Sequence, residues 1–378
     1  MNPKNILKYV ILGLFVLNLP TVALKSFGSV AGTILSYGSF FLLICYYLFF
    51  LKGKPHVGIL ICGVLYFAFG AFQLMGEERD FFTNFAKFFI VVFFGSSFFS
   101  EITRKEVRIV LAIGAISIIL NSVYFDNFNG RAAGFYFNPN GAGFVALFGY
   151  AISNNMKAGK YKIAMQIIFS LAGFLTFSRT FLVIWALINV ISIRSNPKNI
   201  RILVAGVVVF LALLVVGSAF DIGGKRFDKY KGVLSDETTT EDLGHDSRDE
   251  TWALFYDAIF EKPIFGYGYG SFQGGGIKGI GAHNTYLLII GESGIIPLLF
   301  FVGLLIILLI KSWRLFYIEP SLFLLCLALT IYLLTTHNFY DNEVKLALSL
   351  FLFNKIYQVE ELNTISSKES YQIKSEKG

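Results

Sequence analysis

Charged residues are scarce in this sequence. Asp, Glu, Lys and Arg make up 15% of its 378 residues, whereas a soluble domain carries about 25%. Hydrophobic residues make up 55%, and the mean hydropathy is +0.64. This composition excludes an ordinary soluble protein and predicts an integral membrane protein.

Cysteine and histidine are also rare. Cys45, Cys62 and Cys326 all lie in apolar runs, so none can form a disulfide in an extramembrane loop. The 4 histidines show no spacing that would ligate a metal. We therefore expect no metal and no cofactor.

The first apolar run is not a typical signal peptide, because no cleavage site of small residues follows it.

Long apolar runs fill most of the chain. A helix needs ~20 apolar residues to cross the bilayer core, where only structures that satisfy their own backbone are tolerated. The sequence therefore predicts an all-α polytopic membrane protein with about 12 transmembrane helices and one long extracytoplasmic loop containing an amphipathic helix. The predicted spans are residues 6–24, 28–51, 56–75, 81–100, 106–125, 139–155, 161–177, 180–194, 200–220, 295–311, 320–337 and 342–358.

Lysine and arginine are distributed unevenly between the two sides of these spans. With both termini in the cytoplasm, the short outer loops and span ends hold only Lys25, Arg79, Arg131, Arg179 and Lys345, while the cytoplasmic connections are rich in basic residues. The positive-inside rule favours this orientation. The formal charge of +7 follows from it and is poor support for a nucleic-acid partner.

The pattern divides the chain into five segments. Residues 1–125 form an N-terminal transmembrane scaffold, and 126–220 form transmembrane helices that carry N-P-N and S-R motifs. Residues 221–283 form the extracytoplasmic loop, which is the candidate catalytic segment. Residues 284–358 form the C-terminal transmembrane helices, and 359–378 form a polar, mobile cytoplasmic tail.

The loop contains an amphipathic helix that begins at Arg248. Ser247 and Glu250 form a capping box, and Lys262-Pro263 ends the helix. The first helical position places the guanidinium beside free backbone amides, where an anion such as phosphate can bind. Acidic residues in the same turn compete with such an anion for the helix dipole. Trp252 lies one turn further along the same face.

Two more arginines lie at predicted outer span ends. Arg131 precedes an N-P-N turn in which Asn138 caps a helix starting at Pro139. Arg179 lies between two closely spaced spans, so its guanidinium is at the depth of an amphiphilic ligand's phosphates. The alternatives are a surface position for Arg131 and an interfacial anchor for Arg179. We favour a ligand contact for Arg179 and leave Arg131 open.

The glycine-rich end of the loop leads to the candidate general base. Its G-x-G-x-G spacing has no preceding strand and no following G-K-[ST], so a nucleotide-binding loop is poorly supported. We favour a flexible, aromatic-bearing loop that closes over a sugar. In it, Tyr267, Tyr269 and Phe272 either stack on glycan rings or pack the loop onto the membrane face. His283 follows, with Asn284 beside it, and an imidazole next to an apolar run is well suited to take a proton.

Four other ionisable residues are of interest. His337 and Asp341 lie in the last outer loop and are secondary candidates for the site. Glu292 is expected to end a short helix and to have no catalytic role. Lys87 lies within or near the fourth span, and snorkelling of its side chain to the surface is the favoured interpretation.

Several motifs occur in a fixed order along the chain. They are R-x-x-G at Arg131, N-P-N at 138–140, S-R at 178–179, R-x-x-x-W from Arg248 to Trp252, P-x-x-G-x-G-x-G-x-F from Pro263, H-N-x-Y-L at His283 and E-x-G at Glu292. Each motif is weak alone. Together, from about Gly130 to Pro297, they resemble the O-antigen ligase and O-antigen polymerase superfamily of bacterial cell-envelope enzymes.

The resemblance implies a metal-independent, membrane-embedded glycosyltransferase of the GT-C type. Such an enzyme moves a glycan from undecaprenyl diphosphate to an acceptor sugar on the outer face of the bacterial cytoplasmic membrane. By motif, Arg179 and Arg248 hold the diphosphate, and His283 activates the acceptor hydroxyl for direct, inverting attack. The expected substrate-binding residues are Arg131, Trp252, Tyr267, Tyr269 and Asn284. The expected partners are the lipid-linked donor, the glycan acceptor, the bilayer and a chain-length regulator, without nucleic acid.

Three questions stay open at the level of sequence. A ligase joins polymer to lipid A core and a polymerase extends one lipid-linked repeat with another; we lean toward the polymerase. A transporter or flippase for lipid-linked saccharides also needs about 12 spans and outer arginines, although no internal repeat supports it. A non-catalytic partner in envelope assembly would make His283 dispensable.

Overall fold

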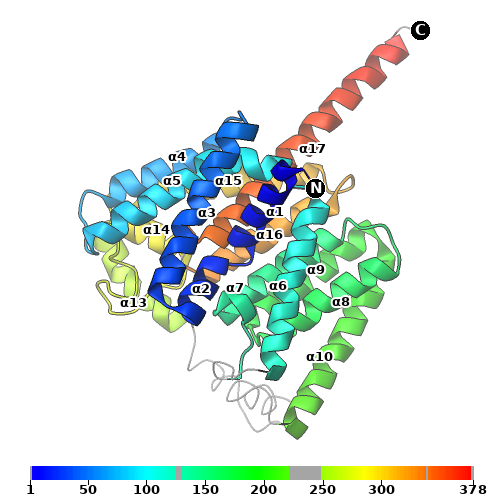
Figure 1. Cartoon of the computed structure of the whole chain (residues 1–378), viewed down its shortest axis with the longest axis horizontal. Helices are drawn as coiled ribbons and strands as arrows, with labels where there is room; N and C mark the ends of the chain where they lie inside the picture. Colours follow the sequence, from blue (N-terminus) through cyan, green and yellow to red (C-terminus); the bar gives the residue numbers. More distant parts are fainter. Residues whose placement is uncertain (1, 125–129, 221–247, 338, 376–378) are drawn as a thin grey trace.

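The fold is all-α, as predicted. The computed structural model describes residues 2–124, 130–220, 248–337 and 339–375, and these residues form helices and connections without a strand (Figure 1). Residues 221–247 of the predicted loop, including the capping residue Ser247, lie outside the described residues.

The helices follow one another with short connections. In chain order they are α1 (Pro3–Val16), α2 (Leu19–Phe27), α3 (Ser29–Phe50), α4 (Val57–Gly70), α5 (Glu78–Glu101), α6 (Arg104–Tyr124), η1 (Gly134–Tyr136), α7 (Pro139–Ser153), α8 (Lys160–Leu175), α9 (Arg179–Ser195), η2 (Pro197–Asn199), α10 (Ile200–Phe220), α13 (Arg248–Glu261), α14 (Thr285–Ser293), α15 (Ile295–Arg314), α16 (Pro320–Tyr332), η3 (Leu333–Thr335) and α17 (Glu343–Ser375).

A helix occupies each predicted span, but not all of these helices are long enough to cross a bilayer alone. Four described helices are long and apolar enough to cross a membrane: α3, α5, α6 and α15. Helices α1 and α2 are long enough only as a pair, and the pair is bent by 67° at its break. The structure therefore supports membrane-spanning helices, while the count of about 12 and the extracytoplasmic position of the long loop stay predictions.

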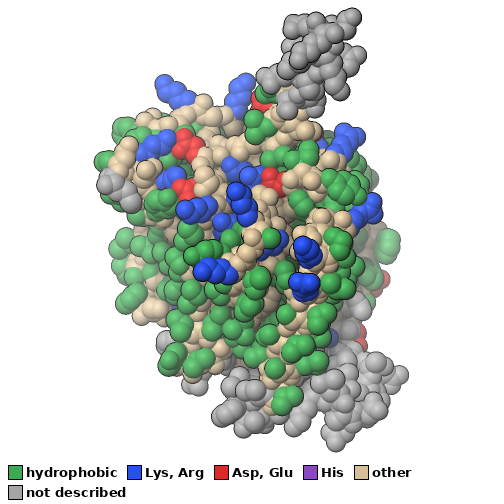
Figure 2. All heavy atoms as spheres, turned by 90° about the vertical axis from the view of Figure 1, so that its right-hand side faces the viewer, with side chains coloured by type: hydrophobic (Ala, Val, Ile, Leu, Met, Phe, Trp, Pro, Cys, Tyr) green, Lys and Arg blue, Asp and Glu red, His purple; other side chains and the backbone are tan. Residues whose placement is uncertain are grey.

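Basic side chains gather at one end of the molecule. Figure 1 shows the C-terminal end of α17 at one end, and α13 and the end of α10 at the other. Figure 2 shows that, on the face in view, Lys and Arg lie mostly in the half nearer the end of α17, above a broad apolar band. This separation of charge from apolar surface is typical of a protein in a bilayer.

The C-terminal segment differs from its prediction. Residues 359–375, expected as a mobile tail, continue α17 as one helix to Ser375. No Gly or Pro interrupts this stretch, so nothing in its sequence ends the helix. An ion pair between Lys311 and Glu360 ties α17 to α15.

An aromatic cluster holds the glycine-rich connection after α13 against the helices. Tyr269 is 4% exposed, and its ring contacts the rings of Tyr66, Phe67 and Phe81. Its backbone amide donates to the carbonyl of Gly70 at 2.9 Å. The connection is thus packed onto α4 and α5, which agrees with the packing alternative and not with a loop free to close over a sugar.

Glycine is required where this connection touches the turn between α4 and α5. Gly268 has φ +90°, and a Cβ there would lie 1.3 Å from the carbonyl oxygen of Gln73. Both the positive φ and the close backbone approach exclude larger residues.

Glu292 on α14 is the polar centre of this packing. Its side chain is fully buried, and Oε1 accepts the backbone N–H groups of Gly270 at 3.0 Å and Phe272 at 3.2 Å. Oε2 accepts the hydroxyl of Tyr66. The residue lies in the last turn of α14, as expected, but it fixes the connection that leads to His283.

Replacing Glu292 by Ala should destabilise the protein more than replacing it by Gln. The alanine leaves two buried amides and a buried hydroxyl without an acceptor, each at a cost of about 1–3 kcal/mol. Glutamine keeps one acceptor oxygen. The thermal midpoint in detergent should fall in the order parent, Glu292→Gln, Glu292→Ala. Asp257→Ala, an exposed change on α13, is the control, and equal midpoints for all four proteins would contradict the assignment.

Candidate functional site

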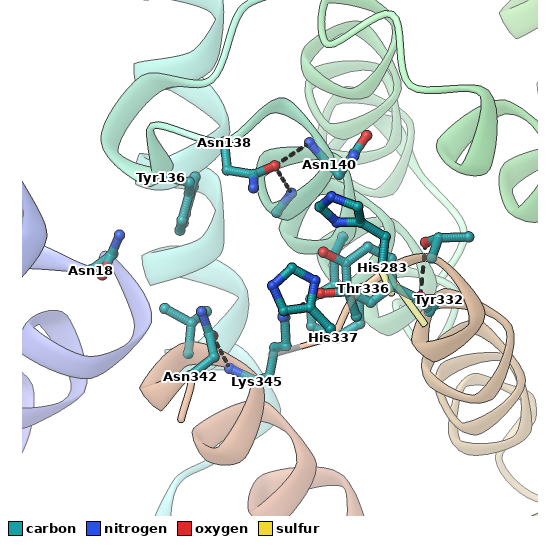
Figure 3. A pocket seen from close by; sticks show the side chains of 14 residues that line it. Asn18, Tyr136, Asn138, Asn140, His283, Tyr332, Thr336, His337, Asn342 and Lys345 are labelled. Carbon is teal, nitrogen blue, oxygen red and sulfur yellow. Dashed lines mark hydrogen bonds between the residues drawn. The ribbon is translucent and has the colours of Figure 1, made fainter. Parts of the chain in front are cut away.

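A polar cavity of about 180 Å³ lies among α7, α14, α16 and the start of α17. Its wall carries four asparagines, two histidines and one lysine, namely Asn18, Asn138, Asn140, Asn342, His283, His337 and Lys345 (Figure 3). Amide groups both donate and accept hydrogen bonds, so such a wall suits a ligand rich in hydroxyl groups.

His283 is held at this cavity by its neighbours in the chain. Its φ is +48°, a left-handed conformation that is uncommon for residues other than glycine. On one side, the amide of Ala282 donates to the carbonyl of Phe272 at 3.0 Å. On the other, Asn284 caps α14 by accepting the amides of Tyr286 and Leu287. The backbone is therefore fixed on both sides of the imidazole.

Asn284 consequently has a structural role in this position. The side chain is 4% exposed, and its oxygen is used by the two amides that it caps. It orients the histidine beside it.

His283 faces a second histidine. The ring centroids of His283 and His337 lie 4.7 Å apart at an interplanar angle of 60°, and Figure 3 shows both rings at the cavity. Partial desolvation, assisted by the charge of Arg248, lowers the pKa of His283 below 6.5. Burial lowers the pKa of His337 to about 4, with further contributions from His283 and Lys345. Both imidazoles are therefore neutral at pH 7.

Arg248, the first residue of α13, links this helix to the start of α9. Its Nη1 donates to Oγ1 of Thr180 at 3.0 Å. Thr180 directly follows Arg179, the first residue of α9, whose side chain is exposed. Arg248 also acts electrostatically on His283. The structure thus brings Arg179, Arg248 and His283, the three predicted catalytic residues, into one region.

Arg131 is placed differently from the other two arginines. It is 9% exposed; Nε donates to the carbonyl of Thr176 at 2.9 Å and Nη2 to Oδ1 of Asn140 at 3.0 Å. The hydroxyl of Ser178 donates to the same Oδ1 at 3.2 Å. Arg131 therefore ties the start of α7 to the turn between α8 and α9. Its direct contacts with the protein give it a positioning role.

Helix N-termini converge around these side chains. Asn138 caps α7 at Pro139, as predicted, and Ser178 caps α9. The bond from Arg248 to Thr180 brings the start of α13 to the start of α9. Each N-terminus carries about +0.5 elementary charge, so together with the arginines they form a region suited to an anionic group.

Trp252 lies one turn after Arg248 on α13 and is half-buried. Its indole nitrogen is buried and has no hydrogen-bond partner within the described part of the chain. Buried donors are nearly always satisfied, so such a group calls for an explanation. On α13 the buried face is formed by Phe255, Ala258 and Ile259, while Tyr256 is exposed.

The two predicted tyrosines do not line the cavity. The Tyr269 hydroxyl accepts from Nδ2 of Asn84 at 2.8 Å within the aromatic cluster described above. Lys262 lies 4.4 Å from the ring centroid of Tyr267. A hydrogen bond to Glu261 raises the pKa of Tyr267. Tyr269 holds the connection in place because its ring and hydroxyl are both occupied by the protein.

Sequence reasoning missed Lys345 and Asn18 in the cavity wall. Lys345 is 5% exposed, and Nζ donates to Oγ1 of Thr336 at 2.6 Å. The feature of the sequence that could have identified Lys345 is its position near the start of an apolar run. Asn18 lies at the break between α1 and α2, and its signal was the N-L-P sequence inside the first predicted span. Among the described residues, no group of His, Cys, Asp and Glu is arranged to hold a metal ion.

Replacing Arg131 by Lys should lower stability, because an ammonium cannot reach both of its acceptors in the same fork geometry. Loss of one hydrogen bond predicts a decrease of about 1 kcal/mol in the free energy of unfolding. Thermal midpoints in detergent provide the measurement. Arg201→Lys, at an exposed arginine of α10, should leave the midpoint unchanged. Equal midpoints for both variants would show that Arg131 does not tie these helices together.

Comparison with known families gives one match. Residues 164–302 match a family model described as O-antigen ligase. This range includes Arg179, Arg248 and His283 and ends beyond the E-x-G motif, while Arg131 and the N-P-N turn lie upstream of it. A comparison with curated proteins found no match. The match confirms the resemblance seen in the motifs: residues 164–302 are similar to the O-antigen ligase family, which supports the O-antigen ligase and polymerase superfamily.

Proposed function

We propose that this protein transfers a glycan from undecaprenyl diphosphate to an acceptor sugar at the cavity beside His283. The family supports a ligase- or polymerase-type role in polysaccharide assembly and a glycosyltransferase-like activity. The observation that carries the proposal is the position of Arg248, which contacts the N-terminus of α9 through Thr180 and acts on His283. Phosphate-binding and proton-accepting groups are thereby adjacent.

The donor diphosphate is assigned to Arg179 and Arg248. Guanidinium groups stay charged at any physiological pH and match phosphate oxygens with two parallel hydrogen bonds. Negative charge grows on the leaving diphosphate as the glycosidic bond breaks. Fixed cations and helix N-termini already directed at this position stabilise that charge without reorganisation.

The acceptor hydroxyl is assigned to His283. The neutral imidazole takes the proton while the hydroxyl oxygen bonds to the anomeric carbon, and undecaprenyl diphosphate leaves from the opposite face. The configuration at that carbon inverts. His337 stays neutral beside it, so it adds no positive charge to that of Arg248 in opposing protonation of His283. No metal takes part in this proposal.

The membrane orientation in the proposal follows the distribution of basic residues. The protein lies in the bacterial cytoplasmic membrane, with both termini in the cytoplasm and the cavity on the outer side. Basic side chains concentrate toward the end of the molecule where α17 projects (Figure 2), which is the cytoplasmic end under the positive-inside rule. The acceptor is a second lipid-linked repeat in a polymerase, or lipid A core in a ligase, and we favour the polymerase.

Replacing His283 by Ala should reduce transfer about 10²-fold or more, the usual contribution of a general base. The assay uses proteoliposomes with undecaprenyl-diphosphate-linked repeat units, without nucleotide and with excess chelator. Product is measured as chain length, in parallel reactions with and without lipid A core. Arg248→Ala should also lower the rate, and Arg201→Ala on the exposed side of α10 should not.

The two acceptors separate the candidate activities. Longer lipid-linked chains without lipid A core indicate a polymerase, and product formed only with core indicates a ligase. An active His283→Ala variant would rule out His283 as the base. A parent protein that transfers to neither acceptor would contradict the transferase and favour transport of lipid-linked saccharides.

The rate should stay above half of its maximum at pH 6.5 and fall further at lower pH. His283 must be neutral to accept a proton, and its pKa is lowered from 6.5, so the active form persists below that value. Initial transfer rates from pH 8 to below pH 6.5, with the donor well below its KM so that the rate reports the protein without bound diphosphate, are the measurement. A half-maximal rate at or above pH 6.5 would contradict the lowered pKa.

A further inference from the structure

A second, larger cavity lies beside the site. Its volume is about 410 Å³, and its wall is formed by α2, α3, α5 and the residues at the start of α17. Asn18 and Asn342 belong to the walls of both cavities. The larger cavity therefore shares part of its wall with the cavity beside His283.

The shared wall is built on an interrupted span. Asn18 has φ +55° and ψ +35° at the break between α1 and α2. Its Oδ1 accepts the hydroxyl of Thr21 at 2.7 Å, and Nδ2 donates to the carbonyl of Phe135 at 3.4 Å. Irregular backbone at membrane depth is tolerated where it is buried in protein or lines a water-filled cavity. The break between α1 and α2, with its bend of 67°, is tolerated because it borders polar cavities.

The larger cavity carries ionic groups of both signs. Lys87 and Glu343 form an ion pair at 3.7 Å, and the wall also contains Arg79 and Asp341. Lys87 was expected to snorkel to the surface, but it lies on α5 next to this acidic partner. Positive and negative groups are balanced here, in contrast with the cationic region around Arg179 and Arg248.

The remaining wall is rich in hydroxyl groups. Thr21, Thr33, Ser36 and Thr83 line it, together with Tyr37. Hydroxyls and amides exchange hydrogen bonds with sugar hydroxyls in either direction. The carboxylates of Asp341 and Glu343 disfavour a diphosphate here, whereas an uncharged sugar is not repelled by them.

We propose that this cavity binds uncharged sugar residues of the acceptor glycan. The terminal acceptor residue then reaches His283 past Asn18 and Asn342, while the donor diphosphate occupies the arginines on the other side. This inference rests on the proposed transferase and adds to it a saccharide-binding site formed by α2, α3 and α5. Hydrogen bonding by hydroxyl and amide groups suits the sugars of a lipid-linked repeat as well as those of lipid A core.

Filling the cavity with a large side chain tests the proposal by direct binding. Ser36→Trp on α3 and Thr83→Trp on α5 each place an indole in the cavity. Ile34→Trp, two residues from Ser36 but 65% exposed and outside the cavity wall, is the matched control. The probe is the phosphate-free, lipid-free oligosaccharide released from the lipid-linked donor, with lipid A core oligosaccharide as a second probe. Calorimetry in detergent gives the dissociation constant.

The two cavity variants should each raise the dissociation constant at least 10-fold for one of the two oligosaccharides. The oligosaccharide affected identifies the acceptor. In the transfer assay they should raise the KM for the acceptor and leave the KM for the donor unchanged. Ile34→Trp should match the parent in both measurements, and Arg248→Ala should bind the oligosaccharide normally while losing transfer.

The outcomes distinguish this inference from the proposed function. Unchanged binding and acceptor KM in folded Ser36→Trp and Thr83→Trp overturn the acceptor site while the transferase stands. A raised KM for the donor alone also overturns it, because the cavity would then hold donor sugars. If the parent transfers nothing but binds the oligosaccharide in a manner that both tryptophans abolish, the transferase is wrong and the saccharide site stands.

Discussion

The buried carboxylate of Glu292 is the interaction on which the rest of the site depends. It accepts the amides of Gly270 and Phe272 from the connection after α13 and the hydroxyl of Tyr66 from α4. The carbonyl of Phe272 in turn accepts the amide of Ala282, the residue before His283. A short chain of hydrogen bonds therefore runs from the middle of the helical core to the proposed base. Burial of this carboxylate is compensated because several donors surround it.

The electrostatics of the site explain why a lipid diphosphate is a suitable donor. Arg179, Arg248 and the N-termini of several helices bring positive charge toward one region, which suits an anionic group. The lowered pKa of His283, to which Arg248 contributes, is one consequence. A bound diphosphate would offset the charge of Arg248 and make the imidazole a stronger base when the donor is present. In the proposed mechanism, donor binding and proton acceptance are coupled through Arg248.

Local signals in the sequence were sufficient for parts of this structure. The start of α7 at Pro139 and the limits of α13 at Arg248 and Glu261 were predicted correctly, because capping residues and prolines act within one helical turn. The three predicted catalytic residues were identified from ordered motifs, and the structure brings them together.

Other features depended on contacts far apart in the chain. Lys87 is paired with Glu343, and Tyr269 meets Asn84. No local pattern reports which distant partner a buried polar residue will find. The same is true of Asn18, whose place in two cavity walls follows from the packing of α2 against α3 and η1.

Two helices at the site are shorter than a full membrane span. α7 has 15 residues and α9 has 17, fewer than the ~20 needed to cross the hydrocarbon core. Their N-termini therefore do not have to reach the aqueous surface, and the turns before them can lie at the depth of a lipid's diphosphate. Non-helical backbone at such depth needs protein or a polar cavity around it. The two cavities joined at Asn18 and Asn342 satisfy that requirement, so the interruptions of the helices and the space for polar substrates have the same structural origin.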